Sequence, residues 1–110
     1  MRMKLPRSEI VVMDLAGNCA RIYCDDAKSI ERLAALGFHW EEGLFVKNIA
    51  EESERQYIAN ELVKSRAVFS AGRDWSPAEL IAYYREQGIV REKYRVIAWT
   101  KKDVFEIRNC

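Results

Sequence analysis

The sequence predicts an α+β fold in which an antiparallel or mixed β-sheet, built from three hairpins, carries about three helices on one face. Two observations predict it. β-rich runs occur in pairs joined by short turns, which is typical of hairpins. The segments between these pairs have apolar residues at helical spacing and residues that favour helix ends. The expected order is ββαββα(β)αββ, and we expect residues 1–110 to form a single domain.

Six β-rich runs make up the three predicted hairpins. In pairs, they span residues 9–15 and 19–24, 38–40 and 44–46, and 94–99 and 104–108. The connections at residues 16–18, 41–43 and 100–103 are short, and the first two contain the glycine that tight turns favour. One further short run, residues 67–69, is predicted to be either a strand or a buried loop.

The first two predicted helices begin with residues that favour helix N-termini. The carboxylates of residues 25–26 offer an N-cap for the first helix, and Gly37 follows where a C-terminal glycine belongs. Asn48, with Glu51 three residues on, forms a capping-box-like start to the second helix, which ends near Lys64. The expected apolar stripe of this second helix consists of Ile49, Tyr57, Ile58, Leu62 and Val63.

The third predicted helix has the clearest N-terminal signal in the chain. Residues 76–79 place Ser76 at the N-cap, Pro77 at the first helical position and Glu79 at the third. The helix is expected to run to about Gln87, because a glycine follows it.

The composition is that of an ordinary globular domain. Hydrophobic residues make up 49% of the chain and charged residues 32%, so a disordered chain is not expected. The formal net charge of +1 provides no overall field that would attract polyanions. No apolar run approaches the roughly 20 residues that span a bilayer, and the basic N-terminus lacks the apolar stretch of a secretory signal. We therefore expect a cytoplasmic protein that makes no membrane contacts.

Residues with catalytic or metal-binding chemistry are few and dispersed. His39 is the one histidine, and alternation in its predicted strand directs it away from the face of the neighbouring aromatic residues. Cys19 and Cys24 stand five positions apart in one predicted strand, on opposite faces, so they cannot easily share a metal. The glycines are isolated, and no phosphate loop or nucleophile elbow occurs. The sequence therefore predicts no catalytic residue, no metal ligand, no cofactor and no enzymatic activity.

The C-terminal third gives the strongest positive signal, because cations and aromatic residues alternate there. These residues are Tyr83, Tyr84, Arg85, Arg91, Lys93, Tyr94, Arg95, Trp99, Lys101 and Lys102. We expect the anchors for a partner to be the exposed members of a smaller set: Tyr84, Arg85, Arg91, Arg95, Lys101 and Lys102. Tyr83 and Tyr84 occupy adjacent faces of the predicted helix, so we expect at least one of them in the core.

Two kinds of partner fit this composition. Tyr, Trp and Arg are enriched where proteins meet, so our first expectation is a non-enzymatic regulatory or inhibitory protein that binds another protein. The alternative is a nucleic-acid-binding accessory domain, in which aromatic rings stack on bases while cations follow the phosphates.

Adjacent acids supply a rival surface. The pairs at residues 25–26, 41–42 and 51–52 stand at helix starts or in a hairpin turn, where negative charge is stabilised or solvated. Such exposed pairs do not predict acid–base chemistry, which needs carboxylates in different environments within one pocket. An acidic band could instead cover a basic site on a partner. Its expected members are Glu41, Glu42, Glu51 and Glu52.

One short segment resembles a known kind of module. Residues 35–47 join a helix end, Gly37 and a hairpin that contains Trp40. This arrangement resembles the Ala-Leu-Gly-x-x-Trp segments of small modules attached to plasmid and phage DNA-processing proteins. The likeness covers about a tenth of the chain, and Leu44-Phe45 replace the lysine and Trp-Tyr that those modules usually carry. It implies a phage or plasmid setting.

Overall fold

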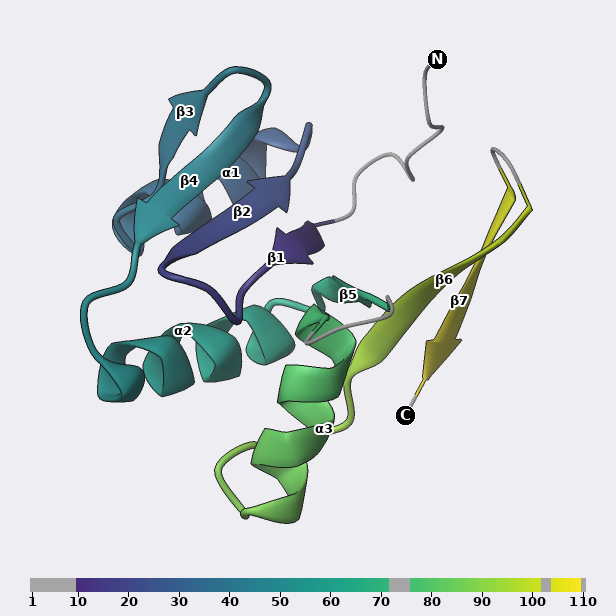
Figure 1. Ribbon diagram of the computed structural model, residues 1–110. Helices are drawn as coiled ribbons and strands as arrows, with labels where there is room; N and C mark the ends of the chain where they lie inside the picture. Colours follow the sequence, from purple (N-terminus) through teal and green to yellow (C-terminus); the bar gives the residue numbers. More distant parts are fainter. Residues whose placement is uncertain (1–9, 72–75, 102–103, 110) are drawn as a thin grey trace.

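The computed structural model describes residues 10–71, 76–101 and 104–109, and within them three helices and one seven-stranded sheet. The elements are β1 (Val11–Asp14), β2 (Cys19–Tyr23), α1 (Ala27–Ala35), β3 (His39–Glu41), β4 (Leu44–Asn48), α2 (Glu52–Lys64), β5 (Val68–Ser70), α3 (Pro77–Glu86), β6 (Arg95–Lys101) and β7 (Val104–Asn109) (Figure 1). The predicted order ββαββα(β)αββ is confirmed, with the short run after the second helix forming a strand. Glu9, the first residue of the predicted first hairpin, lies outside the described residues.

The sheet is mixed, and β5 makes it so. Its strand order is β3-β4-β2-β1-β5-β6-β7. The three predicted hairpins, β1–β2, β3–β4 and β6–β7, are all antiparallel. β5 instead pairs in parallel with β1 on one side and with β6 on the other. Three residues of strand therefore join the two N-terminal hairpins to the C-terminal one, as Figure 1 shows.

All three helices contribute to the core on one face of the sheet, as expected. Alternate strand residues such as Val12, Ile22 and Phe69 pack there with helix residues. The helix residues in this core are Leu33, Ile58, Ala59, Leu62, Val63, Ala78, Leu80, Ile81 and Tyr84. The opposite face holds a second buried cluster of Val11, Val68 and Ile97, which includes no helix residue among those described.

Two of the three predicted helix starts are confirmed. The Asp26 carboxylate accepts hydrogen bonds from the backbone N–H of Ser29, at 3.0 Å, and from its hydroxyl, at 2.9 Å. The Ser76 hydroxyl accepts one from the backbone N–H of Glu79 at 3.4 Å, and Pro77 begins α3. Both residues therefore satisfy a backbone donor that the first turn would leave unpaired.

The predicted capping box at the start of the second helix is wrong. Asn48 is the last residue of β4, where it pairs with Cys19 of β2, so its backbone belongs to the sheet. The N-cap is Glu51, which makes no side-chain capping bond. The Glu54 carboxylate instead accepts a hydrogen bond from the backbone N–H of Ala50 at 3.1 Å. Sheet pairing has moved the helix start three residues along the chain.

Candidate functional site

Tyr84 does not belong to the exposed surface on which the sequence analysis placed the partner anchors. Its side chain is 1% exposed and lies in the helix-side core. Leu80, Ile81 and Tyr84 share one face of α3 at the i, i+3 and i+4 spacing of a helix, and this face meets the sheet. Tyr83, one position earlier, is 45% exposed. The expectation that one of these two tyrosines is a core residue is thus confirmed.

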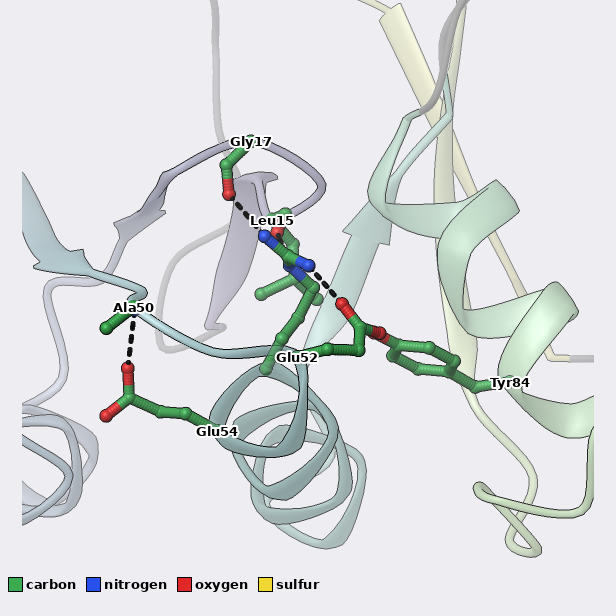
Figure 2. A network of polar contacts seen from close by, with 7 residues as sticks. Leu15, Gly17, Ala50, Glu52, Glu54 and Tyr84 are labelled. Atoms are coloured by element: carbon green, nitrogen blue, oxygen red, sulfur yellow. Dashed lines mark hydrogen bonds and ion pairs between the residues drawn. The ribbon is translucent and has the colours of Figure 1, made fainter.

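The Tyr84 hydroxyl joins a polar network that fastens α2 to its neighbours (Figure 2). It donates a hydrogen bond to the Glu52 carboxylate, which also accepts one from the guanidinium of Arg55. Arg55 donates in addition to the carbonyl oxygens of Leu15, at 3.1 Å, and Gly17, at 2.9 Å. The network therefore connects the start of α2 with α3 and with the β1–β2 turn, which gives it a structural role.

The same contacts shift two pKa values in opposite directions. The hydrogen bond from Tyr84, assisted by Arg55, lowers the pKa of Glu52 below its ordinary value of 4.5. Burial and the neighbouring Glu52 carboxylate raise the pKa of Tyr84 well above its ordinary value of 10.0. The pair therefore stays as a neutral phenol and a carboxylate through the neutral pH range.

Other predicted residues come together around Tyr94, just before β6. The Arg85 guanidinium, from α3, lies 5.9 Å from the centroid of the Tyr94 ring. The ring also packs edge-on against Phe69 of the core, with the centroids 6.3 Å apart. Arg95 directly follows Tyr94 in the chain. The end of α3 therefore meets the chain just before β6.

A small pocket beside Tyr94 gathers further cations. Its volume is about 240 Å³, and it is lined by Val63, Arg66, Ala67, Lys93, Tyr94 and Arg95. Three of these six described residues are cations, and none is acidic. We call Arg66, Arg85, Lys93, Tyr94 and Arg95 the Tyr94 surface. It combines one half-buried aromatic ring with four positive side chains from three separate segments.

Arg66 is the member that the sequence analysis missed. It follows the end of α2, and its backbone has a φ of +63°, a conformation that glycine favours. The N–H of Arg66 donates to the carbonyl of Val63 at 3.0 Å, and that of Ala67 to Leu62 at 3.0 Å. Such bonds close the C-terminus of a helix. The sequence did predict a helix end at Lys64 with no glycine after it, which left another residue to adopt the conformation that closes the helix. No sequence pattern, however, linked Arg66 to Tyr94.

The remaining candidates contribute less to this surface. Arg91 is exposed in the loop before β6 and does not line the pocket. Lys101 ends β6, but its side chain lies outside what the structure describes, as does the whole of Lys102.

The rival acidic residues do not form one band. Glu41 and Glu42 precede β4, whereas Glu51 and Glu52 follow it, so the two pairs lie beyond opposite ends of that strand (Figure 1). The Glu41 carboxylate lies within hydrogen-bonding distance of His39, with 3.1 Å between Oε2 and Nε2. Glu52 is bound by Arg55 and Tyr84, as described above. The charge of Glu52 is therefore neutralised locally by Arg55.

Cys19 and His39 lie on the helix-free face, where a shallow hollow of about 520 Å³ opens over β2, β4 and β3. His39 is exposed and is paired in register with Val46, away from the face of Trp40, as predicted. Cys24 lies in the helix-side core, so the two cysteines point to opposite faces, also as predicted. No group of three or more His, Cys, Asp or Glu side chains suited to a metal ion occurs among the described residues.

Comparison with known proteins adds no identification. No family model matches the sequence, and neither a curated protein nor a solved structure matches it. In the part of the chain that the structure describes, none of the helices has the length and apolar character needed to cross a membrane.

Proposed function

We propose that this chain is a non-enzymatic regulatory or inhibitory protein that acts by binding another protein, and that its contact region is the Tyr94 surface. The observation that carries the proposal is the convergence of Arg66, Lys93 and Arg95 on one pocket beside an aromatic ring. Arginine and tyrosine bury large areas at modest entropic cost and are frequent anchors of protein interfaces. Positive charge, with no acid among the described residues that line the pocket, favours an acidic patch on the partner.

Figure 1 supports a single contact region at this end of the molecule, because α3 leads through one loop directly into β6. Arg85 stands one residue before the end of α3, and Arg95 begins β6. The loop between them carries the exposed Arg91 and Lys93. A partner that covers the Tyr94 ring would therefore meet Arg85, Lys93 and Arg95, with Arg91 in the adjoining loop.

Affinity capture from the native host tests the proposal, with the lysate divided and one half treated with nuclease. A protein partner should be retained equally in both halves. Charge reversal at Arg91 and Arg95 together should reduce its retention while the variant stays folded. Loss of the partner on nuclease treatment would contradict the proposal.

A second candidate is a nucleic-acid-binding accessory domain, and the arrangement of Arg85 over the Tyr94 ring favours it. Aromatic rings flanked by cations are used to hold single strands, because rings stack on bases while cations follow phosphates. Binding dominated by phosphates would weaken steeply between 50 and 200 mM salt, by about a thousandfold for six contacts. An interface between proteins should lose much less over the same range.

We also propose a phage or plasmid setting, on the likeness of residues 35–47 to modules of DNA-processing proteins from such elements. In this chain the segment forms the end of α1, Gly37 with a φ of +100°, and the β3–β4 hairpin. A captured partner encoded by, or acting on, a mobile element would support this setting, whereas a partner with no such connection would contradict it.

A further inference from the structure

We propose that the edge strand β3 binds a second copy of this chain, so that two copies form a two-fold dimer with β3 paired antiparallel to β3. The strand order places β3 at one edge of the sheet and β7 at the other, next to β6 (Figure 1). The Tyr94 surface lies beside β6 and stays exposed in such a dimer. The inference therefore goes beyond the proposed function and concerns a different part of the molecule.

The register of β3 fixes which backbone groups face the edge. Its pairs with β4 are His39–Val46, Trp40–Phe45 and Glu41–Leu44. Glu42 and Gly43 both have positive φ, +48° and +92°, as in a two-residue type I′ turn. The two residues that flank such a turn, Glu41 and Leu44, form a hydrogen-bonded pair. Because bonded and non-bonded pairs alternate in an antiparallel ladder, Trp40 is not bonded to β4, and its N–H and C=O point outward across the edge.

The outward groups of Trp40 are complementary to themselves. When two copies of β3 lie antiparallel with Trp40 opposite Trp40, each N–H can donate to the C=O of the other residue, which makes the two bonds of a hydrogen-bonded pair. A two-fold interface uses the same patch on both copies, and here one residue supplies both the donor and the acceptor. β3 contains no proline or lysine, and no bulge interrupts its pairing with β4, so these common protections of an edge strand are missing from it.

The neighbours of Trp40 select a second copy as the occupant of this edge. In the two-fold register, His39 of each copy stands opposite Glu41 of the other. An imidazole has an N–H donor in either protonation state and a carboxylate accepts, so these two cross-strand pairs are favourable. Both side chains are exposed and lie on one face of the strand, 3.1 Å apart. The charge of Glu41, which would oppose pairing with an acidic strand, therefore faces a donor in this dimer.

The Trp40 ring supplies the apolar contact. It is 61% exposed, and one flank packs edge-on against Phe45, with the ring centroids 5.2 Å apart. Tyr57 and Tyr83 are the other exposed large hydrophobic residues among those described, but both lie on helices, whose backbone groups bond within the helix. In the two-fold register the two Trp40 rings lie on the same face of the joined sheet, opposite each other, where they cover one another. Tryptophan is a frequent anchor of interfaces.

The test is sedimentation equilibrium of the full chain over a wide range of protein concentration. A strand of three residues buries less area than a standard interface, so we expect a dissociation constant between about 10 µM and about 1 mM. Amide hydrogen exchange gives the residue-level readout. The outward N–H of Trp40 should exchange rapidly in dilute solution and more slowly as dimer forms, because it is then hydrogen-bonded.

Exchange of the two flanking residues tests the register. His39→Glu places like charges opposite each other at two positions and should weaken the dimer about tenfold. The double variant His39→Glu with Glu41→His has the composition of the unmodified chain and should restore the affinity. Trp40→Pro removes the outward N–H, a substitution that an edge strand tolerates, and should leave a folded monomer. Tyr57→Ala removes an equally exposed aromatic ring from α2 and should change nothing.

A chain that stays monomeric at about 1 mM would overturn the proposal. So would a dimer that Trp40→Pro leaves intact, or one that the double exchange fails to restore after His39→Glu has weakened it. Binding of a different protein to β3 by a chain that does not dimerise would equally overturn it. Each Tyr94 surface should bind its partner with the same affinity in Trp40→Pro, so this inference and the proposed function can fail separately.

Discussion

Arg66 combines an unfavourable backbone conformation with a side chain that lines the Tyr94 pocket. Glycine adopts a φ of +63° without the steric cost that a Cβ atom imposes. We predict that Arg66→Gly raises the free energy of unfolding by about 1 kcal/mol, the typical penalty for a side chain in this region. Urea denaturation measures it. A variant less stable than the unmodified chain would show that Arg66 contributes to folding rather than to binding.

Tyr84 and Glu52 give a prediction about acid stability. A carboxyl whose pKa is lowered by folding stabilises the protein above its unfolded pKa of about 4.5, and this contribution is lost as pH falls through the folded value. Tyr84→Phe removes the largest cause of the lowered pKa. This substitution should lower the free energy of unfolding by about 1 kcal/mol at pH 7, the usual contribution of one hydrogen bond.

The pH profile separates that bond from a packing defect. In Tyr84→Phe the pKa of Glu52 should lie closer to its ordinary value. The difference in the free energy of unfolding between the variant and the unmodified chain should therefore shrink as pH falls below 4.5. Unfolding curves at pH 7 and near pH 3 measure both differences. A difference of the same size at the two pH values would mean that the hydroxyl acts through packing alone.

Cys19 and His39 provide the residue-scale test of the proposal that the protein is not an enzyme. They lie on the helix-free face, and the hydrogen bond of His39 goes to Glu41, not to a thiol or hydroxyl. We predict that Cys19→Ala and His39→Ala each retain the biological activity. Lost activity in a variant of native stability, or stoichiometric zinc in the purified protein, would contradict that prediction.

At the scale of single elements, Ser76 tests the assignment of the third helix. Its hydroxyl caps α3, which supplies Tyr84 to the core and Arg85 to the Tyr94 surface. Ser76→Ala should lower the free energy of unfolding by about 1 kcal/mol, the typical loss of an N-cap. Ser53→Ala, in the exposed first turn of α2, serves as the control and should change it much less. Equal effects of the two substitutions would count against the cap.

Local signals predicted the elements well where one residue type determines the geometry. Ser76 with Pro77, and Asp26, mark helix starts because their side chains or rings suit the first turn whatever surrounds them. The predicted helix start at Asn48 was wrong because the backbone conformation of Asn48 is determined by its pairing with Cys19, which is 29 positions away. Likewise, nothing local in residues 68–70 shows that β5 would stand between β1 and β6, parallel to both.

At the scale of the whole molecule, part of the candidate site was predictable and part was not. Arg85 and Arg95, two members of the Tyr94 surface, were expected from the alternation of cations and aromatic residues within one stretch of sequence. Arg66 lies outside that stretch, and only the pairing of β5 with β6 brings the turn before β5 to the start of β6. Tyr84 was included among the candidate partner anchors because the helical pattern left open which of two adjacent tyrosines faces the core.

The central claim is that the protein works through the Tyr94 surface and not through the acids around β4. Its most direct test compares the affinity of the captured partner for two double variants, one with Arg91 and Arg95 changed to Glu and one with Glu41 and Glu42 changed to Lys. Truncation of a true anchor typically costs about 2 kcal/mol or more, so the first variant should bind at least tenfold more weakly at native stability. The second should bind as the unmodified chain does. Unchanged affinity in the arginine variant, with binding abolished in the glutamate variant, would show that the acidic side is the working surface.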